Sequence, residues 1–285
     1  MTLPTFLGIG VPRAGTTWLH TLLGAHPDVY LPTRRKEVQF FDRYHDEGLE
    51  WYETFFCSLT EAGRYAAIGE ISPQYLYCEE CPDRIAEAVP GALLLVMLRH
   101  PVDRAYSNYG FVVQRRNYRG SFEEFLASRP DMLEKGFYSP HLKRYLRRFD
   151  RERILPIVFE DAMREGDRTR RTIAAFLDVP AEGFPTSLGK VNASTVPRHG
   201  ALSSAAVKVG RRLRRRHLEA VVDLGARLGA RRALSSGSPL PRIDPDLRTR
   251  LSRPYEREFD ELEGSLGIDV SSWRKPVRAP ESATS

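Results

Sequence analysis

The stretch TFLGIGVPRAGTT, residues 5–17, decides the fold of this chain. Residues 5–10 form an apolar run that is short enough for a buried strand. After the turn, Trp18, Leu19, Leu22 and Leu23 recur at helical spacing, and the pattern ends at residues 24–27. A helix that begins at such a turn has free amides at its start, where its dipole adds positive potential. The stretch therefore predicts a binding site for a phosphate or sulfate group.

The turn nearly matches a nucleotide-binding Walker A loop. Gly10 and Gly15 have the spacing G-x-x-x-x-G, and Thr17 stands for the terminal Ser/Thr, but Thr16 occupies the position of the lysine. The only cation in the turn is Arg13. The sequence therefore indicates nucleotide phosphate binding. A strand–turn–helix corner with incidental glycines is the alternative.

A kinase would need more than this loop. Phosphoryl transfer uses the Walker lysine, a magnesium ion and an acidic residue at the end of a second strand. The best second strand, residues 92–98, ends in Arg99 instead. We therefore expect no metal site, and a nucleotide-binding phosphotransferase with a degenerate loop remains the alternative function.

Length and composition are those of one large globular domain. The chain has 285 residues, of which 41% are hydrophobic and 28% are charged. We expect a single domain over residues 1–275 and a flexible tail over residues 276–285. No stretch approaches the roughly 18 apolar residues of a membrane span. The start of the chain lacks a signal-peptide pattern, so we expect a cytoplasmic protein.

The net charge favours one class of ligand, and the cysteine pattern argues against another. A net charge of +6 favours an anionic ligand, but no zinc-finger or RNA-binding signature is present, so we expect no nucleic-acid partner. Cys78 and Cys81 form a C-x-x-C pair without a second pair or a histidine cluster. We expect these thiols to be reduced rather than to bind zinc.

Strands and helices alternate along the chain. Strands are expected at residues 5–10, 66–71, 92–98 and 154–159, and helices at residues 18–23, 83–89, 101–114, 169–177 and 244–266. Residues 28–31 are expected to be a link, residues 188–204 a loop and residues 235–241 a flexible break. The alternation predicts an α/β fold with a central parallel sheet flanked by helices. Ligands bind such sheets at the carboxyl ends of the strands, so the loops after Gly10, Ile71, Arg99 and Glu160 should converge.

Three separated stretches resemble the sulfotransferases that use 3′-phosphoadenosine 5′-phosphosulfate (PAPS). Residues 12–19, PRAGTTWL, are similar to their 5′-phosphosulfate loop. Residues 98–107, LRHPVDRAYS, are similar to their 3′-phosphate segment. Residues 36–42, KEVQFFD, are similar to the glycosaminoglycan branch and its bacterial relatives. With weaker matches at residues 159–161, 176–177 and 272–273, the resemblance covers roughly residues 5 to 275.

The resemblance implies a P-loop-nucleotide-kinase-like sulfotransferase fold and an enzyme of that class. Such an enzyme transfers a sulfuryl group from PAPS to a hydroxyl of a small molecule, glycan or glycolipid and releases PAP, with no metal. The donor-binding residues that it implies are Arg13, Ala14, Gly15, Thr16, Thr17, Trp18, Arg99 and Ser107, with Lys190, Asn192 and Ser194 from a loosely matching late loop. The catalytic residues that it implies are Glu37 as the base, with Arg13 and Lys36 at the transferring group.

Two departures bear on these assignments. Many members have lysine at the position of Arg13, and arginine keeps the charge but not the shape. Glycosaminoglycan enzymes often have lysine near Ile71, so the isoleucine here weakens the case for a sulfated-polysaccharide acceptor.

The residues themselves leave alternatives open. Glu37 beside Lys36 has the pattern of a solvated surface charge, and Arg104 has that of a surface cation. His100 and His141 are alternative bases, because a sister branch uses histidine. Neighbouring cations would lower the pKa of Glu37 and an apolar pocket would raise it. The sequence does not decide between these two effects.

The basic C-terminal region supports a further alternative. Its cations are Lys208, Arg211, Arg212, Arg214, Arg215 and Arg216. Such a run is typical of a solvated helix face, but it also fits a non-catalytic protein that binds anionic glycans or membranes. The presence of Glu37 favours an enzyme over that reading.

Overall fold

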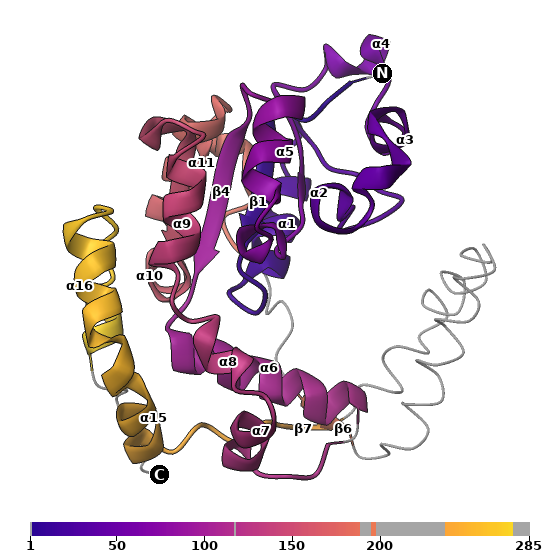
Figure 1. The fold of residues 1–285 in the computed structure, drawn as a ribbon. Helices are drawn as coiled ribbons and strands as arrows, with labels where there is room; N and C mark the ends of the chain where they lie inside the picture. Colours follow the sequence, from indigo (N-terminus) through magenta and orange to yellow (C-terminus); the bar gives the residue numbers. More distant parts are fainter. Residues whose placement is uncertain (1, 117, 189–194, 198–236, 276–285) are drawn as a thin grey trace.

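The computed structural model describes residues 2–116, 118–188, 195–197 and 237–275 (Figure 1). Its centre is a five-stranded sheet in the order β2-β3-β1-β4-β5. The strands are β1 (Phe6–Gly10), β2 (Val29–Tyr30), β3 (Ala67–Ile71), β4 (Leu93–Leu98) and β5 (Ile154–Val158). Every pairing in this sheet is parallel, so the strand ends lie on one side. The predicted α/β class with a central parallel sheet is confirmed.

Helices surround this sheet. The first group is α1 (Thr16–Gly24), α2 (Phe40–Arg43), α3 (Leu49–Glu53), α4 (Leu59–Ala62), α5 (Cys81–Ala88), α6 (Pro101–Arg116) and α7 (Phe122–Ser128). The second group is α8 (Asp131–Glu134), α9 (Ser139–Leu146), α10 (Phe159–Arg164), α11 (Gly166–Leu177), α15 (Pro245–Ser252) and α16 (Glu256–Gly264). Short 3-10 helices span His45–Glu47, Tyr75–Tyr77, Arg151–Arg153, Ala181–Gly183, Arg253–Tyr255 and Ser271–Arg274. Among the described helices, none combines the length and apolar character that crossing a membrane requires.

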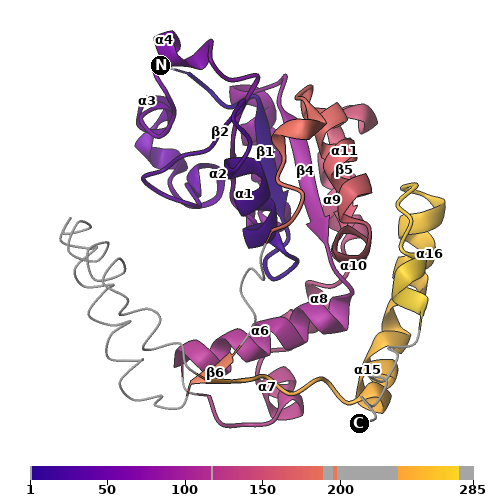
Figure 2. The same cartoon turned by 180° about the vertical axis from the view of Figure 1, so that it is seen from behind.

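The arrangement places the loops of interest together. The arrow of β4 points toward α6, which runs across the carboxyl ends of the strands (Figure 1). α15 and α16 lie on the side of the molecule opposite α2 and α3 in both views (Figure 2). The loops that follow β1, β3 and β4 therefore open toward the region above α6.

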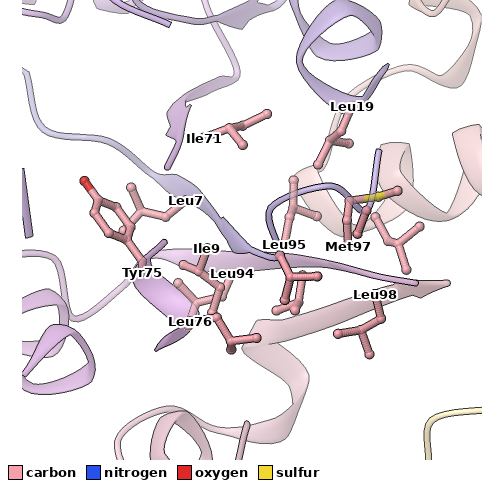
Figure 3. Packing of buried hydrophobic residues seen from close by; sticks show 14 of the residues in the cluster. Leu7, Ile9, Leu19, Ile71, Tyr75, Leu76, Leu94, Leu95, Met97 and Leu98 are labelled. Atoms are coloured by element: carbon pink, nitrogen blue, oxygen red, sulfur yellow. The ribbon is translucent and has the colours of Figure 1, made fainter. Parts of the chain in front are cut away.

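The core forms because the two central strands are apolar throughout. Every residue of β1 is buried, and so are Leu94 to Leu98 in β4. Figure 3 shows Leu7 and Ile9 of β1 beside Leu94 and Leu95 of β4, with Leu19 of α1 packed nearby. Strands that are covered on both faces need such continuous apolar runs, which is why the sequence identified them.

Several segments differ from the expected ones. Residues 28–31 contain the edge strand β2 rather than a plain link, because Val29 and Tyr30 pair with β3. The expected final helix is two helices joined at Arg253–Tyr255, where Pro254 lacks an amide hydrogen. Residues Thr195–Pro197 and Gly237–Pro239 form a small antiparallel pair, β6 and β7, inside the expected loop and break.

The cysteine prediction is wrong. Cys78 and Cys81 are joined by a disulfide, and Cys57 is free and buried. Cys81 begins α5, and its amide donates to the sulfur of Cys78. The turn at the start of this helix brings the two sulfurs together. The run of cations at residues 208–216 lies outside the described residues.

Candidate active site

The turn after β1 has an unusual backbone. Arg13 has φ 73° and Gly15 has φ 92°, both left-handed. Only glycine fits at position 15, since a Cβ there would lie 2.5 Å from Cδ2 of Phe159. Among the described residues, no side chain caps the start of α1, and its first turn has no acidic residue. The first amides of α1 are therefore available to an anion.

The predicted loop residues differ in exposure. Ala14 and Thr16 are buried, while Gly15, Thr17 and Trp18 are partly exposed. Trp18 packs against the core with part of its surface. Its contact with the donor stays a prediction, as do the donor contacts of the other loop residues.

Arg13 connects the loop to α6. One of its terminal nitrogens, Nη2, donates to Oγ of Ser107 at 3.2 Å. Its guanidinium also lies 5.0 Å from the ring centroid of the partly exposed Phe111. Burial, and then the nearby Arg99, lowers the pKa of Arg13 to about 10. The side chain therefore stays charged near neutral pH.

Arg99 at the end of β4 faces the same loop. Its Nη1 donates to the backbone carbonyl of Arg13 at 3.1 Å, and its guanidinium lies 4.8 Å from the ring centroid of Phe159. Burial lowers its pKa. The buried Nε atoms of Arg13 and Arg99 have no hydrogen-bond partner in the described part of the chain. Arg13, Arg99 and Ser107, which the sequence predicted to share one site, are therefore brought together with unused donors.

Lys36 reaches the loop from a different segment. Its Nζ donates to Oγ1 of Thr17 at 2.7 Å. Burial is the largest effect on its pKa, which is lowered, while the adjacent Glu37 raises it and Arg13 lowers it further. Burial, and then the nearby Lys36, lowers the pKa of His20 to about 4. Lys36 is thus a half-buried cation in contact with the loop rather than a solvated one.

Glu37 is half-buried next to Lys36. Burial raises its pKa more than Lys36 lowers it, and Asp42 adds to the rise. The sequence left these two effects undecided, and burial is the larger one. A carboxylate with a raised pKa is a stronger proton acceptor near neutral pH.

The two histidines are poorly placed for proton transfer. His100 is fully buried, its ring lies against Phe259 and Trp273, and its Nε2 is 3.3 Å from Oγ of Ser252. Burial lowers its pKa to about 4. His141 opens α9, as expected, but its Nδ1 accepts from Arg144 at 2.7 Å. Burial, with Arg144, lowers its pKa to about 4 as well.

Other predicted residues have structural contacts. Arg104 is buried rather than a surface cation, and it donates to the carbonyl of Met132. Glu160 follows β5 and accepts from the amide of His100 at 3.0 Å and from Nε1 of Trp273 at 2.8 Å. This pair of contacts joins the end of β4 to the C-terminal part of the described chain. Lys190, Asn192 and Ser194 lie outside the described residues.

The sequence analysis missed the group that surrounds the segment before α2. Glu70 in β3 is fully buried, and Tyr52, Ser72 and Tyr75 donate to its carboxylate. The available signal was a glutamate in the middle of an otherwise apolar strand. Within the described residues, no group of three His, Cys, Asp or Glu side chains is placed to hold a metal ion.

Comparisons with known proteins show which family the chain resembles. The sulfotransferase domain family matches residues 3–196. The chain is 30% identical over 297 residues to human bifunctional heparan sulfate N-deacetylase/N-sulfotransferase 3, covering 95% of this chain and 31% of that protein. It is 33% identical over 138 residues to the membrane-associated sulfotransferase kil1 of Dictyostelium discoideum, covering 46% of this chain and 29% of that protein. The chain thus spans under a third of the length of these two relatives.

A solved structure is similar over nearly the whole chain. The sulfotransferase from Alicyclobacillus acidocaldarius aligns with a TM-score of 0.65 and 26% sequence identity. The alignment covers 96% of this chain and 100% of that one. The described fold and the matched family therefore agree.

Proposed function

The chain belongs to the sulfotransferase family and is related to its glycosaminoglycan branch, and from this premise we propose its reaction. It transfers a sulfuryl group from PAPS to a hydroxyl of a small molecule, glycan or glycolipid and releases PAP. Residues 1–275 act as a single sulfotransferase domain.

The observation that supports a PAPS donor most directly is the cationic end of the sheet. Arg13 and Arg99 present buried nitrogen donors without described partners, next to uncapped amides of α1. A guanidinium suits the paired oxygens of phosphate and sulfate groups. In this proposal Arg99 and Ser107 bind the 3′-phosphate, while Arg13 and the amides of residues 15–17 bind the 5′-phosphosulfate.

The chemistry needs a proton acceptor and a means to neutralise the leaving group. Glu37 takes the proton from the acceptor oxygen as that oxygen bonds to sulfur. The bond between sulfur and the 5′-phosphate oxygen breaks, and PAP leaves with that electron pair. Arg13, Lys36 and the loop amides stabilise the charge that grows on the phosphate. Lys36 is suited to this role by its contact with Thr17.

Acceptor loops at residues 42–64 and 117–138 are proposed to select the acceptor. One relative is named a heparan sulfate N-sulfotransferase, so an amino group of an amino sugar belongs among the acceptors to be tried. The absence of lysine at Ile71 makes hydroxylated small molecules and glycolipids equally worth testing.

The test is a screen of acceptors with labelled PAPS, together with PAP binding measured by calorimetry in EDTA. Label transfer to a hydroxylated or aminated acceptor and metal-free PAP binding are the expected results. Binding of ATP with magnesium but not of PAP in EDTA would instead favour the phosphotransferase alternative. PAP binding without transfer to any acceptor would favour a non-catalytic binding protein. Removal of residues 276–285 should leave PAP affinity unchanged if the single-domain proposal is correct.

A further inference from the structure

A fully buried carboxylate lies behind the segment that contains Lys36 and Glu37. Glu70 is 0% exposed in β3. Its Oε2 accepts from the amide of Val38 at 3.3 Å and from Oγ of Ser72 at 2.6 Å. Its Oε1 accepts from the hydroxyls of Tyr75 at 2.6 Å and Tyr52 at 3.2 Å. Each oxygen of this carboxylate thus receives two hydrogen bonds.

The hydrogen-bond partners of Glu70 themselves accept hydrogen bonds from the same segment. Oγ of Ser72 accepts from the amide of Gln39 at 2.9 Å. The hydroxyl of Tyr75 accepts from the amide of Phe40 at 2.8 Å and that of Phe41 at 3.4 Å. Figure 3 shows this hydroxyl pointing away from the leucine cluster of the core. Four successive amides, from Val38 to Phe41, are therefore held by one group centred on Glu70.

The backbone that these contacts hold is not one that the sequence favours. Gln39 has φ 58°, a left-handed conformation that a residue with a Cβ rarely adopts. Such a conformation persists where its surroundings over-determine it, and it is common at functional sites. Lys36 and Glu37 directly precede this turn, so the turn sets where their side chains project.

The cost of burying Glu70 argues against a purely packing role. Burial raises its pKa to about 7, although four donors oppose the rise. Removing a carboxylate from water costs several kcal/mol unless it is well hydrogen-bonded. An apolar residue at this place in β3 would cover the core without that cost, but it would leave the amide of Val38 and the hydroxyl of Ser72 without their acceptor.

We propose that Glu70 is a positioning residue that, through Ser72 and Tyr75, fixes the backbone of residues 38–41 and thereby the placement of Glu37 and Lys36 at the reaction centre. This inference rests on the proposed function of Glu37. Glu70 itself does not touch the donor or the acceptor.

The first test is a double-mutant cycle. Glu70→Gln keeps the volume of the side chain but replaces one carboxylate oxygen by an amide NH2 group. This group donates hydrogen bonds and cannot accept those that the oxygen accepted. It should lower kcat by about 10- to 100-fold, the size expected when a reacting group is misplaced. The KM for PAPS should change less than about twofold. In the Glu37→Gln background the same change should lower kcat by a clearly smaller factor than in the wild type, because one of the two side chains that Glu70 positions is already gone.

The matched control is Glu258→Gln. Glu258 is also buried and accepts from the amide of Ser139 at 2.7 Å and from its hydroxyl at 2.8 Å, far along the chain from the loop. Its replacement should leave kcat unchanged while lowering stability by a comparable amount. An equal fall of kcat in Glu258→Gln, or an undiminished effect of Glu70→Gln in the Glu37→Gln background, would overturn the proposal.

The second test does not depend on activity. Amide hydrogen exchange of residues 38–41 should accelerate about tenfold or more in Glu70→Gln, while the amides of β1 and β4 keep their protection. If Glu70→Gln does not fold, Tyr75→Phe takes its place, with Tyr255→Phe as its control, since the hydroxyl of Tyr255 donates to Leu133 instead. Unchanged exchange at residues 38–41 would refute the positioning role. Faster exchange of residues 38–41 in Glu70→Gln, found together with a wild-type protein that transfers no sulfuryl group, would support the geometry and contradict the proposed function alone.

Discussion

Replacing Gly15 by alanine perturbs the loop after β1 at a residue that has both a left-handed backbone and closely packed surroundings. The residue has φ 92°, and the new Cβ would lie 2.5 Å from Cδ2 and 2.8 Å from Cε2 of Phe159. A left-handed backbone costs a non-glycine residue about 1–2 kcal/mol. Pressing a methyl group against a packed ring costs about 1–3 kcal/mol more. We therefore expect Gly15→Ala to lower the free energy of unfolding by about 2–5 kcal/mol.

Substitutions at two other glycines separate the backbone contribution from the packing contribution. Gly267 has φ 61° but nothing within 4 Å of its Cβ position, so Gly267→Ala should cost only the backbone term of about 1–2 kcal/mol. Gly63 has φ −62° and also has nothing within 4 Å. Gly63→Ala should therefore be neutral or should stabilise the fold by about 0.4–1 kcal/mol.

The assay is equilibrium unfolding in urea, combined with calorimetry of PAP binding. The ring of Phe159 lies 4.8 Å from the Arg99 guanidinium, so a displaced ring should disturb Arg99 and weaken PAP only in Gly15→Ala. The reasoning is refuted if Gly15→Ala and Gly267→Ala unfold within about 0.5 kcal/mol of each other, the scatter of surface substitutions. Unchanged PAP affinity in Gly15→Ala would separately contradict the link to Arg99.

Four further outcomes are expected. Glu37→Gln should lower kcat by about 10²–10⁴-fold with little change in the KM for PAPS, and more than about a tenth of wild-type turnover would exclude it as the base. Arg13→Ala should weaken PAP as well as lower kcat, in contrast to Glu37→Gln. Ser107→Ala should weaken PAP more than adenosine 5′-phosphosulfate, which has no 3′-phosphate, and equal losses for the two ligands would place Ser107 elsewhere. The pKa of Glu37 is raised by burial, so the fall of kcat/KM on acidification should begin above the pH of an ordinary glutamate and should disappear in Glu37→Gln.

The sheet was predictable because its strands are apolar on both faces. Residues 5–10 and 92–98 were found as strands since burial leaves a continuous apolar run, and β1 and β4 occupy them. β2 was missed because a two-residue edge strand, Val29–Tyr30, is too short to show any periodicity. The disulfide between Cys78 and Cys81 was missed because the expected compartment, rather than local geometry, guided the prediction.

The candidate site was partly predictable for a related reason. Arg13 and Arg99 lie just after the ends of β1 and β4, and Ser107 lies within the helix that follows β4, so topology brings the three residues together. The group around Glu70 depends on contacts between β3, a short 3-10 helix and the segment before α2, which no local pattern encodes. The pKa of Glu37 was undecided for the same reason, since burial is a property of the folded chain.

Arg99 connects the two ends of the proposed donor site through a hydrogen bond. Arg99 is proposed to bind the 3′-phosphate, and its Nη1 also donates to the carbonyl of Arg13 in the loop proposed to bind the phosphosulfate. Arg13 in turn reaches Ser107. A nucleotide that binds at one end of the proposed donor site would therefore also change the geometry of the other end. Selectivity for a doubly phosphorylated donor would then arise from cooperativity between its two ends rather than from two independent contacts.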